Sequence, residues 1–382
     1  MGHTPVNIEE PRINFQWSLL LASGHRPFFL MAGLYGAVAL PLWMAAYLGY
    51  LPLSASWHGH EMIFGFAVAA IAGFLMAAVP NWTNSSGIRG WSLLLLISLW
   101  LAGRLSMWVG EAGFLDLLFL PALAVFILVD LVRAQNARNY LVAGILLALA
   151  ALNVYFHYSD PSLALRLSTL TIVALIALIG GRIIPAFTQN ALRLKQQVDI
   201  TCHTPRVLDL LAVPAVIIVV FAEMMLPDSS ISGTTSLIAG ILLFLRMLGW
   251  QTWRTWRMPL VWILHAGYAW VPLGLILIGL AALGAPVDPS AALHALTTGA
   301  IGVMILAVAS RAALGHSGRP LEPSNGTVFA YCLVIAAAIL RVFVVVDGSV
   351  LLSGVLWSLG YAIFSAVYWP ILTKPRIDGL PG

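Results

Sequence analysis

The sequence predicts an all-α membrane protein that crosses the bilayer with twelve helices. Three observations predict this fold class: an apolar composition, apolar runs of spanning length, and basic residues confined to alternate connections. Hydrophobic residues make up 60% of the 382 residues and charged residues only 9%, whereas soluble domains carry about 25% charged residues. A water-soluble surface cannot be built from this composition, so we expect an integral membrane protein.

Apolar runs of about 18 residues or more recur along the chain, and each can cross the bilayer as a helix. A backbone in lipid must satisfy its own hydrogen bonds, which leaves helices or closed barrels, and these runs exceed the ~10-residue alternating strands of a barrel. We expect spans at residues 27–49, 58–79, 91–108, 112–132, 138–158, 163–186, 206–226, 234–253, 259–283, 290–313, 325–346 and 349–371. Because the connections are short, residues 1–382 form one polytopic domain.

Basic residues indicate which connections are cytoplasmic. Arg12 and Arg26 precede the first span. The connections after the even-numbered spans, and the C-terminal tail, hold Arg89, Arg133 and Arg138, Arg193 and Lys195, Arg254 and Arg257, Arg319, and Lys374 and Arg376. The connections after odd-numbered spans hold no lysine or arginine, and their charged residues are all acidic: Glu111, Asp160, Asp228, Asp288 and Asp347. Twelve spans with both termini in the cytoplasm satisfy this pattern. Loop orientation also explains the net charge of +4, so we expect no nucleic-acid partner.

Two further features narrow the class of protein. Residues 1–26 do not resemble a cleavable signal peptide, because Pro11 and polar residues interrupt them. Cys202 and Cys332 form neither a CxxC pair nor a CxxCH haem-attachment motif. Any haem would therefore be held without thioether bonds.

The spans divide into three groups of four, at residues 27–132, 138–253 and 259–371. An even number of spans gives each repeat the same orientation, as in transporters with parallel repeats. The second span ends with AVPNWTN and the sixth with IIPAFTQ, while His60 and His294 share an H-x4-G spacing at matching places in the second and tenth spans. Helices rich in alanine and leucine also resemble one another by chance, so chance similarity stays an equal alternative.

The residues His58-Gly59-His60-Glu61 begin the second span, where polar groups are expensive and are rarely placed without a function. The predicted topology puts His60 and His294 at one depth near the outer face. Two histidines at equal depth can face each other across a flat cofactor, and neutral imidazole binds both haem iron and copper. We therefore predict a b-type haem between His60 and His294.

Two arginines lie near the outer ends of the third and eleventh spans, at about the depth of the histidine pair. Arg104 and Arg341 could pair with haem propionates. The alternative is that their side chains reach to the membrane interface. Within the spans, Arg182 lies deeper and needs a carboxylate or substrate partner. Glu61 either orients a neighbouring histidine by accepting a hydrogen bond or carries protons.

Three further histidines are candidates for a second metal or an exchangeable ligand: His58, His265 and His316. About 200° separates His58 from His60 on a regular helix, so either His58 precedes the helix or the two serve different roles. The alternative for each histidine is a hydrogen bond between helices. We expect that use, or simple interfacial exposure, for His157 at the end of the fifth span.

Five motifs in order resemble the NnrS family over nearly the whole chain. They are HRPFFL at 25–30, WHGHEMIFG at 57–65, AVPNWT at 78–83, GRIIPAFT at 181–188 and GHSGR at 315–319. The resemblance implies a bacterial inner-membrane protein of the nitric oxide response, often found with denitrification, that contains haem and copper. His25 replaces an aromatic residue that is more usual in the family, which puts a required role for it in doubt.

The predicted layout is also similar to subunit I of haem–copper oxidases, in which histidines of the second and tenth of twelve helices hold a haem. The oxidase His-Pro-Glu and His-His motifs are absent, so the analogy concerns the fold and not the reaction. Function therefore stays open between two main classes. One is a haem protein that binds or redox-processes nitric oxide. The alternative is a proton-coupled secondary transporter of an anion or metal, and a weaker third is a membrane factor that inserts or protects a metal.

Overall fold

A computed structural model describes residues 17–109, 113–196 and 201–379, and helices are the only regular secondary structure in these ranges. Twelve of its helical segments are long and apolar enough to cross a membrane, as predicted. They are α2 (His25–Tyr47), Ala55–Thr83, α5 (Trp91–Val109), Gly113–Arg133, Ala137–Tyr158, α8 (Pro161–Gln196), α9 (Arg206–Met225), Ser230–Trp250, α11 (Pro259–Ala282), Pro289–His316, α14 (Asn325–Phe343) and α15 (Ser349–Thr373). A four-residue helix, α1 (Trp17–Leu20), precedes them.

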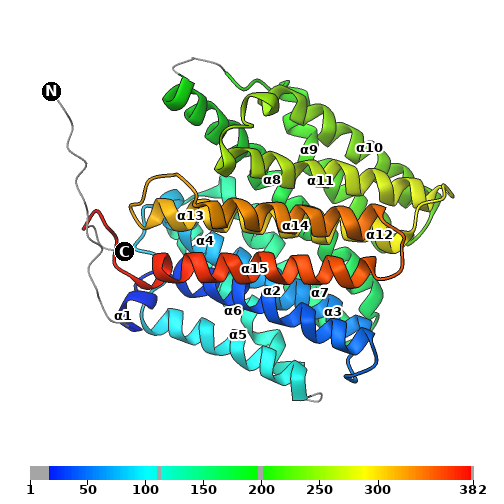
Figure 1. Cartoon of the computed structure of the whole chain (residues 1–382), viewed down its shortest axis with the longest axis horizontal. Helices are drawn as coiled ribbons and strands as arrows, with labels where there is room; N and C mark the ends of the chain where they lie inside the picture. The colour runs from blue at the N-terminus through cyan, green and yellow to red at the C-terminus, as the bar shows by residue number, and fades with distance from the viewer. Residues whose placement is uncertain (1–16, 110–112, 197–200, 380–382) are drawn as a thin grey trace.

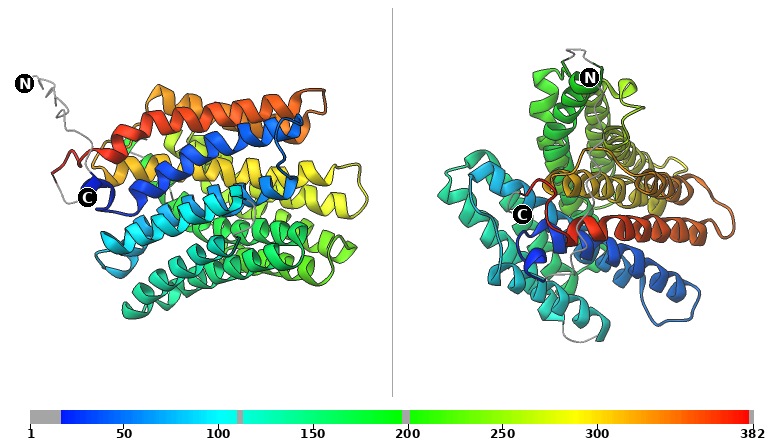
Figure 2. Two further views of the ribbon diagram at one scale, coloured as in Figure 1. Left: turned by 90° about the horizontal axis from the view of Figure 1, so that it is seen from below. Right: turned by 60° about the vertical axis from the view of Figure 1, so that its left-hand side comes forward.

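The spans run along one common direction and form a single bundle (Figures 1 and 2). The last span, α15, packs between α14 and the first span, α2 (Figure 1). At the start of α2, Arg26 donates hydrogen bonds to the carbonyl oxygens of Leu372 (3.0 Å) and Lys374 (2.7 Å) at the end of α15. The first span therefore begins where the last one ends, as an even number of spans requires.

The second and tenth spans are built alike. Each starts with a six-residue α-helix that ends on a histidine, namely α3 (Ala55–His60) and α12 (Pro289–His294). A π-helical segment follows in each, Glu61–Ala67 and Ala295–Gly302, before the α-helix resumes as α4 (Val68–Thr83) and α13 (Val303–His316). Such wide turns are rare and occur frequently at functional sites. His60 and His294 are therefore equivalent in local structure as well as in spacing.

Both short helices have side-chain caps. The Ser54 hydroxyl accepts a hydrogen bond from the Trp57 amide at 3.0 Å. The Asp288 carboxylate accepts from the amides of Ser290 (3.2 Å) and Ala291 (3.1 Å). These caps satisfy amides that have no partner within the helix. They determine where each helix begins, and so the height at which its histidine lies.

The sixth span is longer than predicted. We expected it to end at residue 186, but α8 continues through Pro185 to Gln196. Proline is tolerated within a membrane helix because neighbouring groups can satisfy the freed carbonyl. The extension is stabilised by packing, since Leu192 is buried against Met258 and Val261. The three four-helix repeats and the cytoplasmic location of both termini stay predictions.

Candidate functional site

The two histidines of α3 face different surroundings. Both lie within the helix, and His58 lines a cavity while His60 is fully buried in a polar cluster. The separation of about 200° between residues two apart on a helix produces this split. Of the two expectations for this pair, the structure therefore agrees with different roles.

The cavity has a volume of about 380 Å³ and lies between the first, second, sixth, tenth, eleventh and twelfth spans. Most of its wall is apolar, and it includes the rings of Trp43, Phe66 and Trp357. Three nitrogen-bearing side chains also line it: His58, His294 and Arg341. The structure thus brings His294 together with His58, and not with His60 as the sequence led us to expect.

Hydrogen bonding determines which nitrogen His294 can offer to a ligand. Its Nδ1 lies 2.7 Å from the carbonyl oxygen of Ser290. A carbonyl oxygen only accepts, so Nδ1 carries the proton and Nε2 keeps its lone pair. Histidines that bind metals are commonly oriented by such a bond through the other ring nitrogen. His294 is therefore prepared to act as a ligand through Nε2.

His58 is held differently. Its ring stacks on the indole of Trp43, with centroids 5.0 Å apart and planes inclined by 10°. Within the described ranges of the chain, neither ring nitrogen of His58 makes a hydrogen bond. Both nitrogens are therefore available to a ligand in the cavity.

The two arginines predicted to act together are separated. Arg341 lines the cavity and donates to the Ser290 hydroxyl at 2.7 Å. Arg104 is buried outside it and donates to the carboxylates of Glu61, at 2.5 Å, and Asp116. Only Arg341 is therefore placed to meet an acidic group bound in the cavity.

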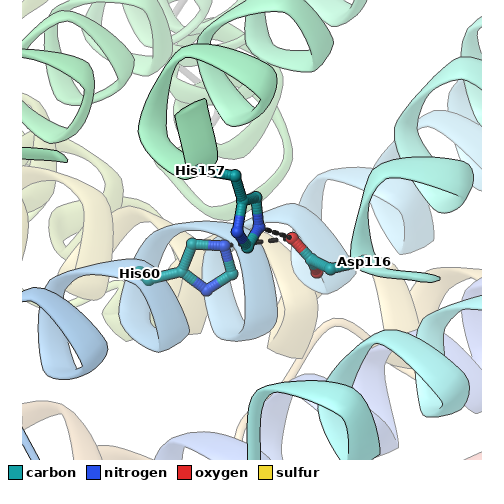
Figure 3. Close-up of side chains that lie close together, drawn as sticks. All are labelled: His60, Asp116 and His157. Carbon is teal, nitrogen blue, oxygen red and sulfur yellow. Dashed lines mark hydrogen bonds and ion pairs between the residues drawn. The ribbon is translucent and has the colours of Figure 1, made fainter. Parts of the chain in front are cut away.

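The polar cluster around His60 joins the second, third, fourth and fifth spans. His60 Nδ1 lies 2.8 Å from Glu61 Oε1, while its Nε2 lies 3.0 Å from Asp116 Oδ2 and 3.1 Å from Asn153 Oδ1. His157 Nε2 also approaches Asp116 Oδ2, at 3.3 Å (Figure 3). Two imidazoles from different spans therefore converge on one carboxylate oxygen.

The charges of this cluster do not balance. Glu61 and Asp116 supply two carboxylates, and Arg104 supplies one guanidinium that contacts both. The hydroxyl of Tyr35 donates to the second oxygen of Glu61. With ionised carboxylates and neutral imidazoles, the cluster has a net charge of −1. Buried charge is costly without compensation, so in this protonation state an added proton or a bound cation would stabilise the cluster.

Comparison with protein families decides to which family this chain belongs. Residues 19–376, nearly the whole chain, match the family model described as NnrS protein. This chain belongs to the NnrS family. No curated protein shows significant sequence similarity to it. The resemblance based on the five motifs is therefore confirmed.

Other predicted site residues of this NnrS protein lie apart from both sites. His265 Nε2 is 2.8 Å from Thr188 Oγ1, and its Nδ1 is 2.9 Å from Thr252 Oγ1. Both of its nitrogens are therefore engaged by hydroxyls. His316 lines a separate cavity of about 370 Å³, and its ring centroid lies 5.0 Å from that of His25. Neither His265 nor His316 shares a site with the other predicted ligands.

Arg182 of the NnrS protein has a different partner from the one expected. Its Nη1 donates to the amide oxygen of Asn139 at 2.8 Å. Among the residues that the structure describes, it forms no ion pair with a carboxylate. An amide partner satisfies one donor and leaves the charge uncompensated.

Sequence reasoning missed two members of the polar cluster, Asp116 and Asn153. For His157 it predicted a hydrogen bond between helices or interfacial exposure, and the contact with Asp116 agrees with the first of these, but it did not predict that His157 lies beside His60. One signal was available, because a carboxylate inside a predicted span is rare and functional by default. No local pattern connects these residues, since they lie on Gly113–Leu118 and α7 (Tyr140–Tyr158), far from α3 in sequence. The packing of spans in this NnrS protein brings them together.

Proposed function

We propose that this NnrS protein is a haem protein of the bacterial inner membrane that binds or redox-processes nitric oxide and supports nitric oxide tolerance. Membership of the family supports a membrane protein of the nitric oxide response. One observation carries the haem assignment: His58 of the second span and His294 of the tenth line one cavity. We place a b-type haem there, and no longer between His60 and His294.

The cavity suits a haem in three respects. Its volume of about 380 Å³ lies within the roughly 300–1,000 Å³ typical of ligand pockets. Its aromatic walls match an apolar ring system. His294 would hold the haem through Nε2, and Arg341 would pair with one of its carboxylates while Ser290 orients the guanidinium.

The two axial candidates are held with different strength. A hydrogen bond to a backbone carbonyl fixes the ring of His294, whereas His58 stacks on Trp43 and makes no side-chain hydrogen bond among the described residues. Bound haem supplies an iron that takes nitric oxide when an axial position is open. We infer that His294 would hold the haem more firmly and that His58 would be the more readily displaced histidine. Copper would compete for the same imidazoles, so we assign none to this cavity.

The visible spectrum of the purified full-length protein tests this proposal. We expect a Soret band in the wild type, its loss in the double variant His58→Ala/His294→Ala, and its retention in His265→Ala. The last variant is a matched control, because His265 is a buried histidine outside the cavity. A Soret band that is unchanged in the double variant contradicts the proposed ligands.

The alternative function is a proton-coupled secondary transporter of an anion or metal. Transporters bind substrates near the bilayer midplane, whereas His58 and His294 lie in the short helices that begin their spans. This placement favours the haem protein. A colourless preparation that drives proton-coupled uptake into vesicles would reverse the preference.

A further inference from the structure

We propose that His60, Asp116 and His157 form a binding site for one first-row transition-metal ion, separate from the haem cavity. Each residue offers one ligand atom, and these atoms lie within 4.8 Å of one another. Figure 3 shows the three side chains pointing toward a common point from different elements. The inference rests on this cluster alone and does not depend on the proposed haem.

The separations between ligand atoms match those around a small metal ion. Bonds of about 2.0–2.2 Å at octahedral or tetrahedral angles place neighbouring ligand atoms about 2.8–3.6 Å apart. Asp116 Oδ2 lies 3.0 Å from His60 Nε2 and 3.3 Å from His157 Nε2. These two separations fit one shared ion, and the ligand atoms of the two imidazoles lie within 4.8 Å of each other.

Hydrogen bonding prepares His60 for this role. Its Nδ1 lies beside Glu61 Oε1. When Glu61 is ionised in its ion pair with Arg104, the carboxylate only accepts, and Nδ1 then carries a proton. In neutral His60 the lone pair of Nε2 then faces the oxygens of Asp116 and Asn153. Three acceptors in contact require a cation between them, either a proton or a metal ion. A carboxylate that orients a histidine in this way is a common feature of metal sites.

Two observations favour a metal ion over a proton alone. A proton on His60 satisfies one imidazole, whereas His157 approaches the same oxygen from a second span. The carboxylate is itself oriented, because Arg104 holds Oδ1 and Asn153 donates to Oδ2 at 2.7 Å. Oδ2 has a second lone pair for the ion. Two of the three ligands, His60 and Asp116, are therefore oriented by other residues, as ligands of metal sites commonly are.

The donor set determines the class of metal. Imidazole nitrogen suits copper, iron, nickel and zinc, whereas magnesium and calcium prefer oxygen ligands alone. Two histidines and one carboxylate leave coordination positions open, which permits an exchangeable ligand. Copper and iron are therefore the first ions to test, with zinc as the ion without redox chemistry.

Metal content and the Soret band, measured on the same purified full-length protein, test the inference. After loading with Cu²⁺, Fe²⁺ or Zn²⁺ and removal of free ion, we expect one extra equivalent of metal in the wild type. His157→Gln and Asp116→Asn should weaken binding at least about tenfold and keep the Soret band. His58→Ala/His294→Ala should lose the band and keep this metal, and His265→Ala should change neither.

Three outcomes would overturn the inference. They are a wild type that retains no metal beyond haem iron, unchanged affinity in both triad variants, and metal that disappears together with haem in the cavity variant. If the triad variants do not fold, X-ray absorption at the metal edge of the loaded wild type decides instead. Two imidazoles and one carboxylate oxygen are expected in the first shell, and a shell without imidazole contradicts the site. A variant that loses the Soret band but keeps the extra metal bears on the proposed haem and not on this metal site.

Discussion

Replacing Arg104 by leucine is the sharpest test of the buried charge network. The guanidinium contacts both Glu61 and Asp116, and the side chains of the two carboxylates are 0% and 2% exposed. Leucine is shorter than arginine, and it removes the guanidinium charge without supplying a hydrogen-bonding replacement. The variant therefore leaves two carboxylates buried side by side with no cationic partner beyond the neighbouring histidines.

The expected cost follows from this burial. Removing one partner of a buried ion pair destabilises a protein by about 3–5 kcal/mol, because an uncompensated charge remains. Removing the charges as well should restore stability, since apolar or neutral replacements of a whole ionic group are often tolerated. We therefore expect Arg104→Leu to cost about 3–5 kcal/mol and the triple variant Arg104→Leu/Glu61→Gln/Asp116→Asn to recover at least half of it.

Unfolding of the purified protein in mixed micelles, followed by circular dichroism with a metal chelator present, measures these free energies. Arg182→Leu is the matched control, because that arginine donates to an amide oxygen at 2.8 Å. Loss of a single hydrogen bond from a charged donor should cost about 1.5–3 kcal/mol. If Arg104→Leu costs no more than Arg182→Leu, or if the triple variant is less stable than Arg104→Leu, the reasoning about the network is refuted.

Three further predictions concern the architecture around the two sites. A methyl group at Gly65 would lie 2.7 Å from the ring of Tyr35. Gly65→Ala should therefore destabilise the protein by about 1–3 kcal/mol through overpacking. An unfolding free energy of this variant equal to that of the wild type would argue against the close approach. Trp43→Ala removes the ring stacked on His58. If His58 is the displaceable ligand of the proposed haem, this variant should bind nitric oxide faster in stopped-flow absorbance, and an unchanged rate would mean that stacking does not hold His58 in place. Asp288→Ala removes the cap of α12 and should lower the unfolding free energy by about 1 kcal/mol in the same assay. Asp288→Asn keeps a capping oxygen and should preserve most of the stability. Equal losses in the two variants would exclude capping as the cause.

The sequence alone determined the number of spans, because the thickness of the hydrocarbon core and the hydrogen-bonding needs of the backbone act on each segment separately. It also determined that His60 and His294 occupy equivalent places. In both spans a capped six-residue helix leads into a π-helical segment, and this is a property of the local chain. The length of the sixth span was underestimated because its last turns depend on packing against Met258 and Val261.

Only the tertiary structure decided which histidine belongs to which site. Apolarity holds a helix in the membrane but does not specify its rotation about its own axis, which is set by packing against neighbouring helices. That rotation directs His58 into the cavity and His60 into the polar cluster. The lateral order of the spans is likewise invisible in hydropathy, and it brings Asp116 and His157 to His60 from other parts of the chain. The depth of each histidine in the membrane could thus be predicted from the sequence, whereas the direction in which its side chain points depends on how the helices pack.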